Sequence, residues 1–262
     1  MRGGPAVVAC GAATAAAFAV AAFALPSSRA PTTRAGRVAL PPPLAPAFTP
    51  GAPHRLSGAQ FVSQWAPVQR SVVARRAPRS GAPAVAVIGT RTPEGTRNPV
   101  AVVAHAQDPD GRPWVRVALA ELPNGTTGWI PRSAVGGYQT VHTTLDVNLQ
   151  RLRLTLLQEG RPILRAPIAV GTAATPTPRG RFYVRDRLTR YRSPTYGPVA
   201  FGTSARSPIL TDWPAGGFVG IHGTDRPDLV PGRVSHGCIR MRNADILRLA
   251  RRMPVGTPVV VH

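Results

Sequence analysis

Lysine is absent from this sequence, so all 32 basic residues are arginines, and acidic residues number only 11. The formal net charge is +21. Richness in alanine, arginine, proline and glycine is typical of the codon bias of a high-GC genome, which explains the charge without any function. The alternative is attraction to an acidic polymer such as a cell wall, a membrane surface or a nucleic acid. The arginines are scattered, and zinc-finger, helix-turn-helix and RNA-binding signatures are missing, which argues against nucleic acid.

Cysteine is nearly absent as well, since the chain has only Cys10 and Cys238. Cys10 lies in an apolar N-terminal segment, so removal of that segment would leave Cys238 without a disulfide partner. An unpaired cysteine is commonly a buried small hydrophobe. A single thiol in an exported protein is also a candidate nucleophile. The residues around Cys238 indicate whether it is a buried structural residue or a nucleophile.

Residues 1–30 are typical of a secretory signal, with a short basic start, the uncharged run Pro5 to Leu25, and small residues near Ser28 to Ala30. The uncharged run is long enough to cross a bilayer as a helix, so an N-terminal membrane anchor through residues 5–25 stays open. Alanine richness and the arginines after the run weaken the anchor hypothesis. Lipid modification of Cys10 is a third alternative. All three predict an extracytoplasmic protein, either secreted or held in the cell wall or periplasm.

Residues 31–70 are predicted to be a proline-rich linker, in which 31–53 form a semi-extended tether and 54–70 contain an amphipathic stretch of unassigned structure. Five short β-type runs separated by turn signals occupy residues 71–136 and predict a small β-barrel. The last run, GWIPRSAV at Gly128–Val135, resembles the last strand of bacterial SH3-like domains. The sequence leaves open whether this domain binds a ligand or is a spacer.

A second β-rich domain is predicted over residues 138–262. Apolar residues alternate from Leu145 to Leu149 and again, after a shift of phase, from Leu152 to Leu156, which indicates a break or bulge. Gln158–Gly160 predicts a turn. One helix is predicted at Arg242–Met253. Ile246, Leu249 and Met253 form its apolar face, and Asn243 is its expected N-cap. The predicted fold class is therefore mainly β, with a short helix after the second cysteine.

The chemistry is carried by two stretches, GIHGTDRPD at Gly220–Asp228 and SHGCIRM at Ser235–Met241. A thiol becomes a good nucleophile when a histidine accepts its proton and stabilises the thiolate. His222 is far enough along the chain for a loop to bring it beside Cys238, and His236 is the nearer alternative. Gly237 allows a sharp turn and a close substrate, so that the N–H groups of Gly237 and Cys238 face a developing oxyanion.

These two motifs resemble the L,D-transpeptidase catalytic domain, also called the YkuD domain. IHGT followed by SHGC carries the resemblance, and the upstream LDVNLQRLRLTLLQEG, VGTAATPTPRGRFYV and terminal TPVVV occur in the same order. The similarity covers roughly residues 140–262. It implies a β-sandwich catalytic domain and an exported enzyme acting on peptidoglycan stem peptides. The whole chain then reads as a small SH3-like barrel followed by a YkuD-type β-sandwich.

The resemblance also implies roles for individual residues. Cys238 is the nucleophile that attacks the carbonyl between an L-centre diamino acid and a terminal D-alanine, and His222 is the general base and later the acid. The Gly223 carbonyl orients the imidazole. Arg240 contacts a substrate carboxylate, and Ser235 and His236 line the substrate site. The segment from about Asp186 to Gly217, which includes Tyr191, Tyr196 and Trp213, is expected to form a lid or substrate groove, unless its aromatic residues simply pack.

No cofactor and no metal is expected. His222, Asp225, His236 and Cys238 could be drawn as zinc ligands, but the motif supplies no second ligand pair at the usual spacing. The expected partners are peptidoglycan tetrapeptide stems, as donor and acceptor, and carbapenem-type β-lactams as inhibitors.

Three functions stay open at this point. The first is an L,D-transpeptidase that forms 3→3 cross-links, with release of D-alanine and transfer from a Cys238 thioester to an amine. The second is an L,D-carboxypeptidase, which uses the same thioester with water as acceptor. The third is a non-catalytic wall-binding protein that uses the small barrel and the basic surface. The intact His222 and Cys238 argue against the third.

Overall fold

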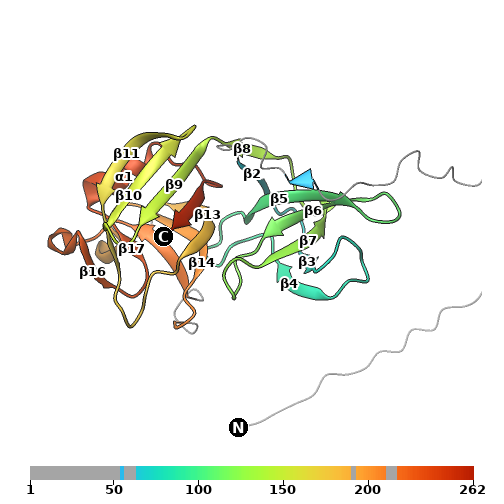
Figure 1. The fold of residues 1–262 in the computed structure, drawn as a ribbon, viewed down its shortest axis with the longest axis horizontal. Helices are drawn as coiled ribbons and strands as arrows, with labels where there is room; N and C mark the ends of the chain where they lie inside the picture. The colour runs from blue at the N-terminus through green and yellow to red at the C-terminus, as the bar shows by residue number, and fades with distance from the viewer. Residues whose placement is uncertain (1–53, 56–62, 190–192, 211–216) are drawn as a thin grey trace, which may run out of the picture. The chain divides into compact units, whose positions relative to one another are not determined.

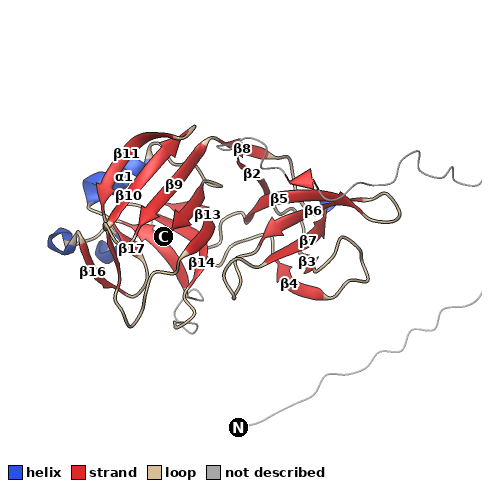
Figure 2. Ribbon diagram, viewed as in Figure 1, coloured by secondary structure: helices blue, strands red, loops and turns tan. Residues whose placement is uncertain are grey.

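The computed structural model describes residues 54–55, 63–189, 193–210 and 217–262. The expected signal or anchor, Cys10 and most of the predicted linker lie outside the described residues, as do Tyr191 and Trp213. Within the described part, no helix is long and apolar enough to cross a membrane. The described residues form two β-sheets that belong to one compact unit, Pro46–His262 (Figures 1 and 2).

The first sheet has eight strands and is entirely antiparallel. Its order is β4-β3-β7-β6-β5-β2-β8, and β1 pairs with β5. Its strands are β1 (His54–Arg55), β2 (Ser63–Pro67), β3 (Val72–Arg75), β4 (Ala84–Ile88), β5 (Pro99–Gln107), β6 (Pro113–Ala118), β7 (Thr127–Pro131) and β8 (Gln139–Val141). Valine, alanine, isoleucine and leucine side chains from these strands form a separate core.

The five β-type runs of the sequence are strands β3 to β7 of this sheet. Strand β2 lies inside the range predicted to be linker, where SQWAP gives no alternation to read. It pairs with β5 and with β8, both distant in sequence. The first sheet thus begins before residue 71. Its likeness to SH3-like domains stays a prediction.

The second sheet has ten strands in the order β11-β10-β9-β18-β13-β14-β15-β17-β12-β16. It is mixed, because β9 with β18, β15 with β17 and β12 with β16 are parallel. Its strands are β9 (Thr143–Asn148), β10 (Arg153–Gln158), β11 (Arg161–Pro167), β12 (Ala169–Gly171), β13 (Gly180–Leu188), β14 (Ala200–Arg206), β15 (Phe218–His222), β16 (Gly232–Ser235), β17 (Ile239–Arg240) and β18 (Pro258–Val261). The mainly β fold class is confirmed.

Alternating leucines and valines build the core of this sheet. Leu145 and Val147 of β9 and Leu154 and Leu156 of β10 are fully buried. The phase shift between the two runs is the turn that joins these strands, where Leu152 has a φ of +48°. The next turn, predicted at Gln158–Gly160, joins β10 to β11. The break in the pattern is therefore a hairpin turn between two strands.

The single α-helix of the described residues, α1 (Asn243–Ala250), follows the cysteine motif as predicted. Ile246, Leu249 and Met253 are buried in the core. The prediction of Asn243 as N-cap is wrong. Arg242 occupies that position, and the Asn243 side chain instead accepts a hydrogen bond from the Thr224 N–H at 2.9 Å.

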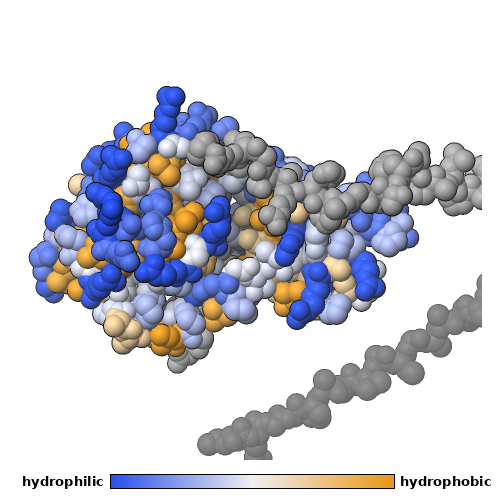
Figure 3. Space-filling model, in the orientation of Figure 1, coloured by the Kyte–Doolittle hydropathy of each residue, from blue (hydrophilic) through white to orange (hydrophobic). Residues whose placement is uncertain are grey.

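The outer face of the strands β9 to β11 is rich in charge. Arg153 of β10 and Arg165 of β11 are exposed diagonal neighbours there, and hydrophilic residues cover much of this face (Figure 3). The role of the segment from about Asp186 to Gly217 as a lid or substrate groove stays a prediction, and part of this segment is regular structure. It contains the end of β13, the short 3₁₀ turn Pro194–Tyr196 and the whole of β14, which lies inside the sheet.

Candidate active site

Two adjacent parallel strands bring the two motifs together. Strand β15 ends at His222 and pairs with β17, with Ile221 opposite Ile239 and His222 opposite Arg240. The chain between β15 and β17 forms the 3₁₀ turn Pro227–Leu229 and strand β16. This connection brings the chain back, so that β17 runs parallel to β15. Cys238 stands just before β17 and therefore lies beside Gly220.

The contact between Gly220 and Cys238 defines the centre of the site. The Gly220 N–H points to the Cys238 Sγ, with the nitrogen 3.4 Å from the sulfur. A Cβ at Gly220 would lie 3.9 Å from that sulfur and 3.8 Å from His222 Cδ2. The thiol and the imidazole thus flank the same small volume, and the glycine between them leaves it open.

His222 is held in one tautomer. Its Nδ1 lies 2.6 Å from the carbonyl oxygen of Gly223. A carbonyl only accepts hydrogen bonds, so Nδ1 carries the proton and Nε2 has the free lone pair. The ring of Tyr196 packs against the imidazole, with 4.6 Å between the ring centroids. His222 is only 2% exposed. This arrangement suits a base that accepts a proton through Nε2.

Burial sets the protonation state of both groups. Burial, opposed by the hydrogen bond to Gly223 and assisted by the charge of Arg240, lowers the pKa of His222 to about 4. Cys238 is partly exposed as a residue, yet the packing around its sulfur raises the pKa of the thiol, opposed by the Gly220 N–H and by Arg240. At neutral pH the pair is a neutral thiol and a neutral imidazole. A thiolate–imidazolium pair forms only when the proton moves.

Ser235 and Gly237 shape the turn before the cysteine. The Ser235 hydroxyl donates to the Cys238 carbonyl at 2.6 Å and accepts the Gly237 N–H at 3.1 Å. Ser235 is 1% exposed, so it braces the turn and does not line a substrate surface as the sequence predicted. The Gly237 N–H is engaged, which removes it as an oxyanion donor in this conformation. The Cys238 N–H has no acceptor among the described residues and is the better candidate.

The turn is held from outside by the loop between β12 and β13. The Thr177 hydroxyl donates to the Gly237 carbonyl at 2.8 Å and accepts the Gly171 N–H at 2.9 Å. The Thr175 hydroxyl donates to the Ser235 carbonyl at 3.2 Å. No role was predicted for these threonines, although the TPTPRG motif that contains them supported the family resemblance. Their role needs the fold, because they lie some sixty residues before the cysteine turn.

Arg240 and His236 lie on the same stretch of chain but differ in burial. Arg240 is half-buried, and its Nε is buried without a hydrogen-bond partner among the described residues. A buried donor left without an acceptor is costly, which makes this guanidinium a candidate ligand of an anionic group. His236 is exposed. No group of three His, Cys, Asp or Glu side chains in the described ranges could hold a metal ion, so the zinc set is not assembled there.

Comparisons with known proteins agree with these motifs. The profile of the L,D-transpeptidase catalytic domain, YkuD, matches residues 142–261. The YkuD protein of Bacillus subtilis, named as an L,D-transpeptidase, is 37% identical over 123 residues, which cover 47% of this chain and 68% of the relative. Its Bacillus licheniformis counterpart is 35% identical over 122 residues, covering 47% and 67%. The solved catalytic domain of the E. faecium L,D-transpeptidase acylated by ertapenem is 28% identical, covering 46% and 96%, with a TM-score of 0.35.

Proposed function

The chain belongs to the L,D-transpeptidase family, and from this membership we propose that it is an exported, cysteine-dependent enzyme that cross-links peptidoglycan stem peptides. One observation carries the proposal. The Cys238 sulfur and the His222 ring flank Gly220, and the bond from Nδ1 to Gly223 leaves Nε2 as the proton acceptor. A cysteine nucleophile beside a histidine base is the pair that acyl transfer through a thioester needs.

In the first half-reaction, His222 Nε2 takes the thiol proton as Cys238 Sγ attacks the carbonyl that joins the diamino acid to the terminal D-alanine. The oxyanion that forms is stabilised by the Cys238 N–H. When the intermediate collapses, the C–N bond breaks, and His222 returns the proton to the departing D-alanine amine. The products are D-alanine and a thioester on Cys238.

In the second half-reaction, the side-chain amine of another stem attacks the thioester carbonyl. His222 accepts the amine's proton, the C–S bond breaks, and the thiol recovers its proton. The new amide is the 3→3 cross-link. Attack by water instead would release a tripeptide, and the same residues would then act as an L,D-carboxypeptidase.

Arg240 is proposed to bind a carboxylate of the donor stem. Its buried Nε has no partner among the described residues, and a guanidinium can hold a carboxylate through two parallel hydrogen bonds. Carbapenem-type β-lactams are proposed to acylate Cys238, because their strained carbonyl can occupy the same position as the donor carbonyl.

The test is to incubate the protein with a disaccharide–tetrapeptide and to resolve the products by mass spectrometry. A dimer that has lost one D-alanine supports the transpeptidase. A tripeptide without dimer supports the carboxypeptidase. An unchanged tetrapeptide, with a folded protein, contradicts both and favours a wall-binding role. The Cys238→Ala variant is the control and should yield neither product.

A further inference from the structure

Strand β13 is buried on both faces, including the face that points away from the hydrophobic core of the second sheet. Phe182 and Val184 point into the core of the second sheet, but Tyr183, Arg185 and Asp186 are also only 2–3% exposed. The first sheet supplies the cover. The Tyr183 hydroxyl donates to the Pro99 carbonyl at 3.2 Å, and Arg185 makes hydrogen bonds of 3.0 and 3.2 Å to both carboxylate oxygens of Glu94.

We propose that the first sheet is part of the catalytic apparatus, and that Glu94 is a positioning residue that acts through Arg185 and Asp186 to hold the Gly220 N–H against the Cys238 sulfur. The inference rests on the proposed function, since it assumes that Cys238 is the nucleophile. It gives the first domain a role other than that of a wall-binding module or a spacer.

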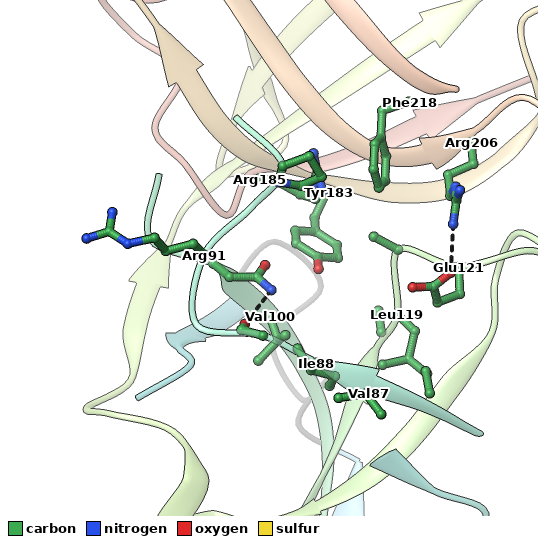
Figure 4. Close-up of a pocket in the computed structure, with 16 residues that line it drawn as sticks. Val87, Ile88, Arg91, Val100, Leu119, Glu121, Tyr183, Arg185, Arg206 and Phe218 are labelled. Atoms are coloured by element: carbon green, nitrogen blue, oxygen red, sulfur yellow. Dashed lines mark hydrogen bonds and ion pairs between the residues drawn. The ribbon is translucent and has the colours of Figure 1, made fainter. Parts of the chain in front are cut away.

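One path runs through Arg185 and Phe218. The guanidinium of Arg185 lies over the Phe218 ring, 3.7 Å from its centroid. Figure 4 shows Arg185, Tyr183 and Phe218 together on one side of a cavity of about 440 Å³. Phe218 is the first residue of β15, the strand that also carries Gly220 and His222. Fixing Arg185 with Glu94 therefore fixes the start of the catalytic strand.

A second path runs through Asp186. Its Oδ1 accepts the Gly202 N–H at 2.9 Å, and a Cβ at Gly202 would lie only 2.5 Å from that oxygen. Gly202 of β14 is the register partner of Gly220 of β15. The pairing register between β14 and β15 shifts after this pair. The Asp186 carboxylate therefore holds β14 at the residue that determines the position of Gly220. This path ends at Gly220, whose N–H contacts the sulfur, and the first path ends at Phe218, two residues earlier on the same strand.

The charges explain why Glu94 matters. Asp186 and Glu94 face the same guanidinium, with 3.9 Å between Arg185 and the Asp186 Oδ2. Burial and the Glu94 carboxylate, opposed by Arg185 and by the Gly202 N–H, raise the pKa of Asp186 to about 6. Without Glu94, Arg185 has Asp186 as its remaining acidic neighbour. The guanidinium would then draw the carboxylate away from Gly202 and loosen β14.

The cavity makes these polar contacts more important. It is lined from both sheets, by Ile88, Val100 and Leu119 of the first and by Arg185, Arg206 and Phe218 of the second. Apolar packing is therefore incomplete where the sheets meet. Two ion pairs lie at the cavity wall, Arg185 with Glu94 and Arg206 with Glu121. Arg206 lies farther from the Phe218 ring than Arg185, at 5.0 Å against 3.7 Å, and its backbone is also held by the Asn124 side chain. The position of β15 therefore depends mainly on the pair Arg185 with Glu94.

The test compares Glu94→Ala with Glu121→Ala. Each removes one ion pair between the sheets, but Arg206 keeps the two backbone hydrogen bonds to Asn124, at 2.8 and 3.0 Å. The measurement is the second-order rate of acylation by meropenem, followed by intact mass, together with the melting temperature. We expect Glu94→Ala to be acylated about tenfold to a hundredfold more slowly than the parent, and Glu121→Ala to be acylated at nearly the parent rate with a comparable melting temperature.

Asp186 provides a rescue experiment. Asp186→Asn keeps an oxygen for the Gly202 N–H, whereas Asp186→Ala does not, so the asparagine variant should retain most of the acylation rate that the alanine variant loses. Equal rates for Glu94→Ala and Glu121→Ala, or an asparagine variant as slow as Glu94→Ala, would overturn the inference. If Asp186→Ala does not fold, the other three variants still decide it. A folded parent that is not acylated would overturn the proposed function and this inference with it.

Discussion

His222 and Cys238 rest as uncharged groups, and this distinguishes the site from one that keeps a preformed thiolate. Burial disfavours both charged forms, and Arg240 stabilises a thiolate while it disfavours an imidazolium. A neutral thiol is less open to oxidation than a thiolate, which suits an enzyme proposed to work outside the cytoplasm. In the proposed mechanism the thiol becomes reactive when its proton moves to His222 Nε2 during the attack.

The acid limit of the reaction follows from the pKa of His222. Because this pKa is lowered to about 4 from 6.5, the imidazole stays neutral and able to accept a proton well below pH 6. We predict that the rate of acylation by meropenem falls with a midpoint near pH 4. Arg240→Met should move that midpoint upward, because it removes a charge that lowers the pKa. A midpoint near 6.5 in the parent would contradict this electrostatic account.

Gly237 is predicted to tolerate no side chain. Its φ is +113°, which strains any residue with a Cβ, although the added Cβ itself would make only ordinary contacts with the carbonyl oxygens of Pro176 and Thr175, at 3.6 and 3.8 Å. Gly237→Ala should cost about 1–3 kcal/mol of stability through backbone strain and slow acylation by displacing Cys238. Gly81→Ala is the control, since an added Cβ there meets nothing within 4 Å. Denaturant unfolding and intact mass measure the two effects, and equal behaviour of the two variants would refute the role.

At the scale of elements, the catalytic turn depends on a loop far from it in sequence. Thr177 is 5% exposed, and its hydroxyl bridges the Gly171 N–H of β12 and the Gly237 carbonyl. Strand β12 in turn pairs with both β16 and β17, which flank the turn. The turn is therefore enclosed by paired strands and by one buried hydroxyl.

We predict that Thr177→Val destabilises the protein by about 1–3 kcal/mol, because it leaves a buried N–H and a buried carbonyl without this partner. Acylation should slow as well, since the carbonyl of Gly237 is released. Thr155→Val on the outer face of β10 is the control and should change neither quantity. The urea dependence of unfolding and the acylation rate give the comparison. An unchanged rate with reduced stability would limit Thr177 to folding.

The sequence predicted the elements whose pattern is local. Alternation marked β9 and β10, and the spacing of Ile246, Leu249 and Met253 marked the helix. It missed β2, whose pairing with β5 and β8 is distant in sequence. It also misassigned Asn243, since the Thr224 N–H that occupies its side chain comes from another part of the chain.

The site shows the same division. His222 and Cys238 were identified from motifs, and the structure places both against Gly220. The use of Ser235 could not be predicted, because the direction of its hydroxyl depends on the turn at Gly237. The burial of Arg185 could not be predicted either, because its cover comes from the first sheet.

At the scale of the whole molecule, the first sheet is joined to the second by contacts between residues some eighty to ninety positions apart. Glu94 pairs with Arg185 of β13, which is next to β14, and Glu121 pairs with Arg206 of β14, which is next to β15. A domain joined to its neighbour only by a tether would not bury charged residues in this way. The two sheets are best understood as one functional unit around Cys238.

The most direct test of the central claim is the intact mass of the protein after incubation with meropenem, measured beside Cys238→Ala and His222→Ala. The account predicts one covalent adduct on the parent, none on Cys238→Ala, and acylation slowed by about 10²–10⁴-fold in His222→Ala. The absence of an adduct on a folded parent, or an adduct that persists in Cys238→Ala, would contradict it.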